Sequence, residues 1–396
     1  MKEEKLQTEV RLAPRPKPWN DPKVRSVIYQ LLAIVCVGFA IWYLVANTLH
    51  NLSLRNISTG FEFLSREAGF AIGESVIKYE PHDTYFRAIS VGLLNTMRVA
   101  VVGIILATIL GTLIGIARMS TNWLVAKLAS IYVETMRNIP LLLQLFFWYA
   151  IISQSMPGPR NAYHPITGVF ISNRGIRLPA LDGGALNWVI ASLFLAIVAI
   201  VLLANWAKKR QEKTGKIFLF GRYALLIFVL FPIFAWFISG DRLALEMPVF
   251  KGFNFVGGIT ITPEFGALLI GLIIYTAAFI AEVVRSGIQS VSQGQWEAAG
   301  SLGLRRPLIF RLIVLPQALR VIIPPITSQY LNITKNSSLA VAIGYPDIVS
   351  VVNTTLSQTG QAIEGIMMVM AAFLTVSLSI SAFMNWYNKR IALVER

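Results

Sequence analysis

The sequence predicts an all-α integral membrane protein with about eight transmembrane helices, and three observations lead to this fold class. Hydrophobic residues make up 55% of the 396 residues and charged residues 14%, against about 25% charged residues in soluble domains. The apolar residues gather in runs near or above the ~20 residues that cross a hydrocarbon core as a helix. Lys and Arg exceed Asp and Glu by 15 and cluster beside these runs. This pattern excludes a cytosolic enzyme and makes membrane lipid, not nucleic acid, the expected partner of the basic groups.

The apolar runs give the predicted spans in chain order. The first run is an anchor and not a cleaved secretory signal, because seven basic residues precede it and no A-x-A-like cleavage site follows it. The segments 50–87 and 153–186 are long enough to form small caps outside the membrane, and turns are expected in the second. The predicted spans are 27–49, 88–117, 124–152, 187–205, 221–239, 263–284, 307–335 and 366–388.

The distribution of basic residues between alternate loops predicts the orientation. The segments on the side of the N-terminus hold 21 Lys and Arg residues, and those on the opposite side hold 9. Because basic residues are retained on the cytoplasmic side of a membrane, both termini are expected in the cytoplasm.

Several kinds of chemistry are missing from the sequence. It has no phosphate-binding loop, no H-E-x-x-H motif and no metal-like grouping of Cys and His, and His50, His82 and His164 are far apart. We therefore expect no catalytic, cofactor-binding or metal-binding residue in this chain. A membrane-embedded protease or transferase is poorly supported, although the carboxylates of Glu134 and Glu282 leave room for one. The energy for any transport must come from an ion gradient or another subunit.

The cytoplasmic loop between the sixth and seventh spans predicts a short helix of its own. Ser292 and Gln295 have the spacing of a capping box for a helix of about ten residues that begins near Gln293. Gly303 is able to adopt the left-handed conformation that ends it, and Pro307 suits the first turn of the next helix.

The side chains of this loop helix suggest a docking element. Trp296 and Leu302 are bulky, Ala298 and Ala299 allow close approach, and Glu297 is the only charge. A Trp among small residues is typical of an interface anchor. The alternative, a helix that lies among the lipid headgroups, has about equal support from these residues alone.

Beyond these physical arguments, the loop resembles a known family. Its residues match, spacing for spacing, the EAA signature of membrane subunits of bacterial binding-protein-dependent ABC importers: Glu297-Ala298-Ala299, Gly303, Ile313 and Leu315-Pro316. Three further pieces resemble the polar amino acid (histidine/glutamine-type) branch: YVETMRNIPLLLQLFF (132–147), FRLIVLPQALRVIIPP (310–325) and LNITKNSSLA (331–340), the last with Ser337 where threonine is common. The loop GVFISNRGIRLP (168–179) resembles the permeases of the general L-amino-acid importers of Gram-negative bacteria.

The resemblance implies a domain organisation. Segments 88–152 and 262–390 supply the two parts of a five-helix permease core, with the coupling loop at 286–306 in the second part. The rest is added: 1–87 as a cytoplasmic tail, an extra helix and a periplasmic segment, 153–261 as an insertion with two spans and periplasmic loops, and 391–396 as a cytoplasmic tail. One helix added in front of the core and two within it leave both termini in the cytoplasm, in agreement with the charge distribution.

The resemblance also implies a function. Such a chain is a multi-pass inner-membrane permease for L-amino acid uptake and not an enzyme, since ATP is hydrolysed by a dimer of separate ABC subunits. A second permease, expected to form a heterodimer, and a periplasmic amino-acid-binding protein complete the system. The residues expected to couple the permease to the ATPase are Trp296, Glu297, Ala298, Ala299, Gly303, Leu315 and Pro316.

Polar residues on the seventh span are candidates for the translocation path. Gln317, Ser328, Asn332 and Lys335 fall on one helical face, together with Arg320 and Pro324. A polar stripe in a lipid-spanning helix should face protein or water, and the prolines of this span predict a bent or broken helix. The alternative is that the stripe only packs helices or pairs charges.

Two carboxylate–guanidinium pairs have the i,i+3 spacing of helical ion pairs or of a gate. They are Glu134 with Arg137 and Glu282 with Arg285. They would share one aqueous mouth only if the third and sixth spans are neighbours, and Glu282 is equally able to pair elsewhere.

Two other classes of protein remain as alternatives. An ion-gradient-driven secondary amino acid transporter would need an internal repeat and a titratable carboxylate at mid-membrane. A membrane scaffold would use the loop helix only as a lipid-surface helix. The spacing of the EAA signature argues against both.

Overall fold

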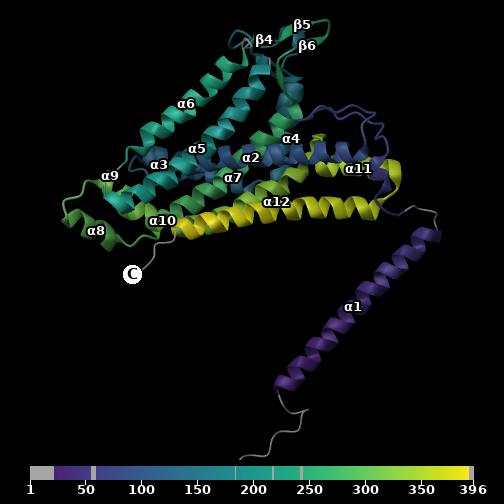
Figure 1. Cartoon of the computed structure of the whole chain (residues 1–396), viewed down its shortest axis with the longest axis horizontal. Helices are drawn as coiled ribbons and strands as arrows, with labels where there is room; N and C mark the ends of the chain where they lie inside the picture. Colours follow the sequence, from purple (N-terminus) through teal and green to yellow (C-terminus); the bar gives the residue numbers. More distant parts are fainter. Residues whose placement is uncertain (1–21, 55–58, 183, 216–217, 241–243, 392–396) are drawn as a thin grey trace, which may run out of the picture.

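The computed structural model describes residues 22–54, 59–182, 184–215, 218–240 and 244–391. Helices make up most of this chain (Figure 1). The long ones are α1 (Pro22–Leu54), α2 (Tyr85–Ala117), α5 (Gly184–Thr214), α6 (Phe220–Ser239), α7 (Pro263–Gln289), α10 (Leu315–Asn336) and α12 (Ala362–Ile391). The shorter ones are α3 (Trp123–Asn138), α4 (Leu141–Ala150), α8 (Gln293–Ser301), α9 (Arg306–Ile309) and α11 (Ile348–Thr359). Most of the predicted N-terminal tail, 1–21, and residues 392–396 of the predicted C-terminal tail lie outside the described residues.

The number of membrane-length elements agrees with the predicted fold class. In the described part of the chain seven helices are long and apolar enough to cross a membrane, and the bent pair of α3 and α4 brings the number to eight. The fold is therefore that of a helical multi-pass membrane protein.

The third predicted span, 124–152, is not one straight helix, because the chain bends by 103° between α3 and α4. Pro140 has no N–H to continue the helix, and Ile139 before it is extended (φ −91°, ψ 126°). The side-chain amide of Gln144 donates to the carbonyl oxygens of Met136 and Ile139, both at 3.0 Å. These bonds satisfy two backbone acceptors at the break, which stabilises it.

The centre of the bundle is the pair α2 and α7, which pack along each other. On the outside of this pair α3, α4 and α10 pack against α7, α11 packs against α2, and α12 packs against α10 (Figure 1). Many of the large fully buried side chains, such as Leu145, Leu272, Ile280 and Ile333, come from these elements, while Phe63 and Tyr345 come from segments outside these helices. Most of the core thus lies between these helices, and a further buried cluster around Phe63 and Ala68 packs against the start of α2.

The segments on either side of α5 and α6 form short strands, which the all-α prediction did not include. β1 (Phe170–Ser172), β2 (Gly175–Leu178) and β7 (Ile259–Ile261) form an antiparallel sheet in the order β1-β2-β7. β3 (Ala180–Asp182) pairs with β4 (Ala244–Glu246), and β5 (Val249–Lys251) pairs with β6 (Asn254–Val256). The pairing of β3 with β4 closes the base of the α5–α6 hairpin.

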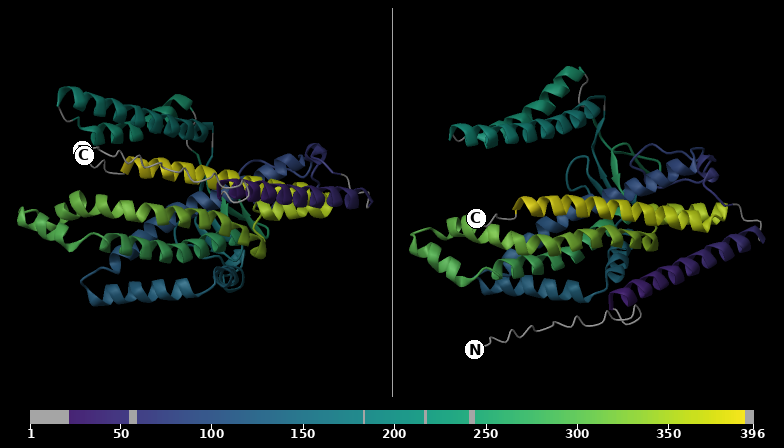
Figure 2. Two further views of the ribbon diagram at one scale, coloured as in Figure 1. Left: turned by 90° about the horizontal axis from the view of Figure 1, so that it is seen from below. Right: turned by 60° about the horizontal axis from the view of Figure 1, so that its bottom comes forward.

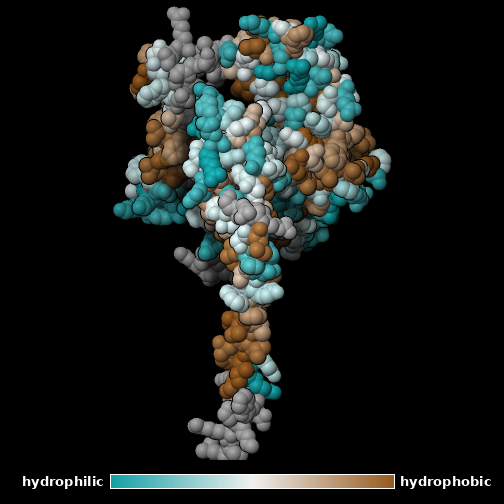
Figure 3. All heavy atoms as spheres, turned by 90° about the vertical axis from the view of Figure 1, so that its right-hand side faces the viewer, coloured by the Kyte–Doolittle hydropathy of each residue, from teal (hydrophilic) through white to brown (hydrophobic). Residues whose placement is uncertain are grey.

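Two parts of the molecule stand apart from the bundle. Both views of Figure 2 show the α5–α6 hairpin separated from the other helices, and α1 projects from the bundle in Figure 1. Figure 3, which looks at the end that carries α11, shows hydrophilic residues at the centre and hydrophobic ones at the flanks and along α1. An apolar lateral surface of this kind is what a lipid environment requires.

Candidate functional site

The helix predicted in the cytoplasmic loop is α8, which projects from one end of the bundle (Figure 1). It begins at Gln293 as predicted, Gly303 follows it in the left-handed conformation (φ +75°), and Pro307 lies in the first turn of α9. The predicted capping box is wrong. Ser292 is the N-cap residue, but its side chain accepts no capping hydrogen bond, and the N–H of Gln295 donates to the carbonyl oxygen of Ser292 at 3.0 Å.

The side chains of α8 face two directions. Trp296 is half-buried in a hollow of about 390 Å³ between the ends of α2 and α7 and the start of α3, and Ala299 is fully buried. Glu297 and Ala298 point outward, and Leu302, just after the helix, is 79% exposed. The structure therefore makes Trp296 an anchor of α8 on its own bundle and leaves Glu297, Ala298 and Leu302 exposed.

The other residues of the EAA signature lie where α9 runs into α10. Leu315 and Pro316 begin α10 directly after a π-helical turn at Phe310–Val314. Gln317, predicted on the translocation path, donates its side-chain amide to Gln295 of α8 at 3.4 Å. Gln317 thus lies at the end of the molecule that carries α8, separate from the other residues of the predicted path.

The remaining path candidates share the exposed face of α10. Ser328, Asn332 and Lys335 are exposed, as are Pro324 and Pro325 on the same helix. Within the described residues Lys335 forms no ion pair. The sequence predicts that this span is bent or broken. It has no sharp break, because Arg306–Ile343 remains one continuous span, but a π-helical turn at Phe310–Val314 interrupts its regular helix before Pro316; the sharp break lies between α3 and α4.

A cluster of ion pairs at the same end of the bundle as α8 is centred on Glu282 of α7. Its Oε1 accepts from Arg285 at 2.6 Å, as predicted, and its Oε2 accepts from Arg118, just after α2. Arg137 of α3 lies 3.9 Å from the same Oε2 and packs over the ring of Phe279. One carboxylate thus joins three helices, and an excess of positive charge surrounds it.

The predicted pair of Glu134 with Arg137 does not form, since Arg137 turns to Glu282 and Glu134 is exposed. The condition for a shared mouth is met, because α3 packs against α7. Sequence reasoning missed Arg118, although its position directly after an apolar span is the signal that marks it as a charge at the membrane surface.

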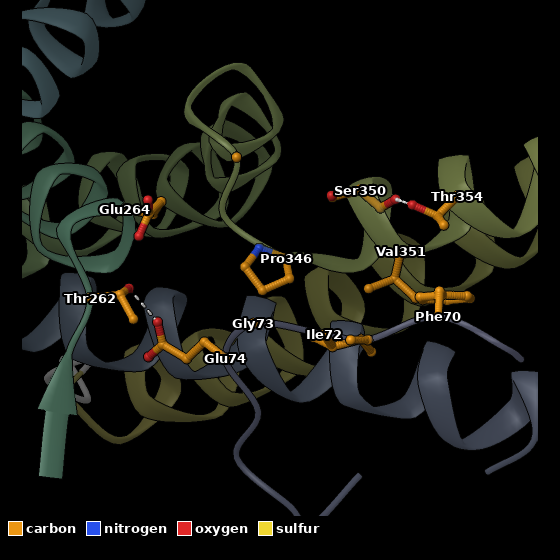
Figure 4. A pocket seen from close by; sticks show the side chains of 12 residues that line it. Phe70, Ile72, Gly73, Glu74, Thr262, Glu264, Pro346, Ser350, Val351 and Thr354 are labelled. Atoms are coloured by element: carbon orange, nitrogen blue, oxygen red, sulfur yellow. Dashed lines mark hydrogen bonds between the residues drawn. The ribbon is translucent and has the colours of Figure 1, made fainter. Parts of the chain in front are cut away.

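A hollow of about 390 Å³ lies at the opposite end of the bundle, where segment 70–74, the start of α7 and the start of α11 meet (Figure 4). Glu74 pairs with Arg98 at 2.5 Å and accepts from the hydroxyl of Thr262 at 2.5 Å. Among the described residues, the side chain of Glu264 accepts one hydrogen bond, from the hydroxyl of Tyr149 at 3.3 Å, and forms no ion pair. The net negative charge of this hollow is therefore on Glu264.

Buried polar groups support this end of the molecule, and the sequence analysis did not single them out. The side-chain amide of Asn95 donates to the carbonyl oxygens of Glu74 and Pro346, both at 2.8 Å, which ties α2 to two loops. Asp347 is fully buried and caps α11 by accepting from the N–H of Ser350 at 2.8 Å. Burial raises the pKa of Asp347 to about 7 from 3.8. Within the described residues no group of three or more His, Cys, Asp or Glu side chains is placed to hold a metal ion.

Comparison with known proteins places the chain in a family. Residues 196–393 match the family model described as "Binding-protein-dependent transport system inner membrane component". The chain is 49% identical over 378 residues to the general L-amino acid transport system permease protein AapQ of Rhizobium johnstonii, covering 95% of this chain and 94% of AapQ. It is 41% identical over 409 residues to the glutamate/glutamine/aspartate/asparagine transport system permease protein BztB of Rhodobacter capsulatus, covering 95% of this chain and 96% of BztB.

The matches to AapQ and BztB each cover 95% of the chain, whereas the family model matches its second half. Proteins of this family are transport subunits in a bacterial inner membrane, not enzymes. The chain belongs to the family of inner membrane components of binding-protein-dependent transport systems, and within it to the permeases of amino acid ABC importers.

Proposed function

We propose that this chain forms part of the pathway for L-amino acid uptake across the inner membrane and that ATPase subunits drive it through α8. The observation that carries the proposal is the geometry of α8. Trp296 and Ala299 fix the helix to the bundle, while Glu297, Ala298 and Leu302 remain exposed at its outer face. A helix held firmly on one side and exposed on the other transmits the motion of a docked ATPase to the helices behind it.

The substrate class follows from the relatives. AapQ belongs to a general L-amino acid transport system, and BztB to one named for glutamate, glutamine, aspartate and asparagine. For this chain we infer L-amino acids delivered by a periplasmic binding protein, with the exposed face of α10 as its half of the path. A cationic Lys335 without an ion pair is suited to attract the carboxylate that every amino acid carries.

The test of coupling is Glu297→Arg in the complete transporter. The exposed carboxylate of Glu297 becomes a cation, so the ATPase subunits should no longer copurify with the permease, and ATP-dependent uptake should fall by an order of magnitude or more. Glu62→Arg is the matched control, because Glu62 is also exposed and lies in the periplasmic segment. Retained ATPase binding and uptake in Glu297→Arg would contradict the coupling role of Glu297. Recovery of the wild-type permease without any ATPase, even after gentle crosslinking, would favour the ion-gradient-driven carrier.

The path is tested separately by radiolabelled uptake. Lys335→Ala and Asn332→Ala should lower uptake while the ATPase subunits stay bound, because these side chains lie far along α10 from α8. Val321→Ala is the control, since Val321 is exposed on the same helix but apolar. Uptake at the wild-type rate in both polar variants would leave helix packing as the role of the stripe.

A further inference from the structure

The α5–α6 hairpin is attached to the rest of the molecule mainly through its base. α5 and α6 pack along each other, and the strands β3 and β4 join their ends to the periplasmic sheet region. The outward faces carry large apolar side chains, among them Phe194, Leu202, Phe234 and Phe237, which are at least 63% exposed. In the described part of the chain no other helix packs extensively against these faces, so they are open to the acyl chains of the membrane.

The turn end of this hairpin carries a dense basic cluster, which we call the hairpin collar. Its basic residues are Lys208, Lys209, Arg210 and Lys213 at the end of α5 and Arg222 at the start of α6. Glu212 is the only acidic residue in 206–223. Its contact with Lys208 is long, at 4.0 Å, and both side chains are largely exposed, so Glu212 neutralises little of the positive charge.

An aromatic cluster fixes the position of the collar. Trp206 lies edge-on against Phe218 with ring centroids 5.3 Å apart, and Phe218 stacks on Tyr223 at 4.9 Å. The guanidinium carbon of Arg210 lies 5.2 Å from the centroid of Trp206 and 5.8 Å from that of Phe218. These contacts join α5 to α6 and hold one face of the guanidinium against the rings, while within the described residues no carboxylate pairs with it.

The composition of the collar matches the chemistry of the membrane surface. Trp and Tyr side chains prefer the depth of the headgroups, where the ring is in apolar surroundings and its polar group is wet. A planar guanidinium binds phosphate oxygens in a bidentate manner, and neighbouring lysines add attraction to an anionic surface. Retention of a positive loop in the cytoplasm needs only the charges, and does not require the packing of Arg210 against the rings of Trp206 and Phe218.

We propose that the hairpin collar is a binding site for the phosphate groups of anionic phospholipids in the cytoplasmic leaflet. The proposal rests on the orientation given by the proposed function, in which the turn of the hairpin faces the cytoplasm. An acidic surface of the ATPase fits the collar less well, because both views of Figure 2 separate the hairpin from the helices that lead to α8. The hairpin then ties the permease to an annulus of anionic lipid.

The test measures lipid contact directly and needs no transport. The complete transporter, with its partner subunits, is placed in phosphatidylcholine nanodiscs in which about one fifth of the lipid is brominated phosphatidylglycerol or brominated phosphatidylcholine. Bromine quenches nearby tryptophan fluorescence, and subtraction of Trp206→Phe isolates the emission of Trp206 from that of the other tryptophans. Brominated phosphatidylglycerol should quench Trp206 about twofold more strongly than brominated phosphatidylcholine.

Charge removal provides the matched comparison. The triple variant Lys208→Gln/Lys209→Gln/Lys213→Gln should abolish the preference for phosphatidylglycerol. A control triple, Lys78→Gln/Arg174→Gln/Lys251→Gln, removes the same charge from exposed residues outside the collar and should keep the preference. Arg210→Lys keeps the positive charge that retains the loop in the cytoplasm but removes the planar guanidinium. If the guanidinium binds phosphate, this variant should weaken the preference for phosphatidylglycerol.

Several outcomes would overturn the proposal. They are equal quenching by the two lipids, an equal loss of preference in both triple variants, and loss of the preference on omission of the ATPase.

Competition with inorganic phosphate distinguishes a lipid headgroup from a soluble phosphate ion as the bound anion. Reversal of the preference by phosphate, with no effect of chloride at equal ionic strength, would assign the collar to a soluble anion. Because fluorescence is read without uptake, failure here is distinguishable from failure of the proposed function.

Discussion

Glu282 shows how much one side chain contributes to the joining of helices at the end that carries α8. Its carboxylate accepts from Arg118 and Arg285 and lies 3.9 Å from Arg137, so it offsets the repulsion among three cations. The side chain of Arg118 is only 11% exposed. Loss of the carboxylate would leave this partly buried guanidinium without its partner, which is the costly way to break an ion pair.

We expect Glu282→Gln to lower the stability of the permease by roughly 1–3 kcal/mol, the cost of a partly buried pair after allowance for solvent screening. The midpoint of thermal unfolding in detergent measures this change. Glu134→Gln is the control, because Glu134 is exposed and forms no ion pair within the described residues. Equal effects of the two substitutions would contradict the arrangement around Glu282.

Asp347 gives the end of the bundle that carries α11 a dependence on pH. Burial raises its pKa to about 7, whereas the unfolded chain releases this proton near 3.8. Between these pH values the folded state holds a proton that the unfolded state has lost, so the contribution of Asp347 to stability falls as the pH rises. The loss is complete above about pH 7.

Asp347→Asn should remove this dependence, because the amide stays neutral and keeps an oxygen to accept from the N–H of Ser350. The unfolding midpoint of the variant should equal that of the wild type near pH 4 and exceed it near pH 8. Asp347→Ala also removes the charge but loses the cap, and should be lower than Asp347→Asn at every pH. A difference between Asp347→Asn and wild type that does not change with pH would refute the assignment.

At the scale of elements, the contact between α2 and α7 depends on small residues. Gly103, Ala107, Gly111 and Gly115 recur at every fourth position of α2, which places them on one face. A Cβ atom at position 111 would lie 2.7 Å from the Cβ of Ile280 and 2.8 Å from a backbone oxygen of α7. Close approach through such positions is how helices associate where lipid supplies no hydrophobic driving force.

Gly111→Ala should therefore force α2 and α7 apart and destabilise the permease by about 1–3 kcal/mol. Gly103→Ala is the matched control, because the added Cβ there would be no closer than 3.4 Å to Ile333 on α10. The two variants are compared by thermal unfolding of the purified protein. A larger loss for Gly103→Ala than for Gly111→Ala would contradict this packing.

The elements also show what the sequence is able to predict. Hydropathy predicts the number of spans, because an apolar run in lipid must satisfy its backbone hydrogen bonds internally and therefore forms a helix. Hydropathy does not show which proline breaks a span. The helix breaks at Pro140, between α3 and α4, whereas Pro324 and Pro325 lie inside the continuous helix α10. The bonds from Gln144 that stabilise the break are visible only in three dimensions.

The same division holds for the candidate site. The position of α8, the turn at Gly303 and the pair Glu282–Arg285 follow from local spacing and are confirmed. The contact of Arg118 with Glu282 joins residues 164 positions apart, and no local spacing predicts it. The inward direction of Trp296 depends on the ends of α2 and α7, which the sequence does not place next to each other.

For the molecule as a whole, the exposed polar face of α10 is incomplete in a single chain. Ser328, Asn332 and Lys335 are exposed within a continuous span, and the Nε and Nη2 atoms of Arg320 are buried without a hydrogen-bond partner in the described residues. Polar and cationic groups at membrane depth need protein or water beside them. We therefore infer that a second permease faces α10.

We expect that second permease to be a different chain and not a second copy of this one. In a two-fold symmetric homodimer joined through α10, the ammonium group of Lys335 would approach an identical ammonium group, and like charges in a low-dielectric interface repel. A heterodimer avoids this, because the facing helix is free to carry a carboxylate or a neutral residue. The test expresses two copies of this chain with different affinity tags, together with the other subunits of the transporter. The two tagged copies should not copurify, and each should instead recover the same second permease, whose sequence differs from this chain. Recovery of both tags in one complex, after gentle crosslinking and at the mass of a dimer, would establish the homodimer and require Lys335 to point away from the axis.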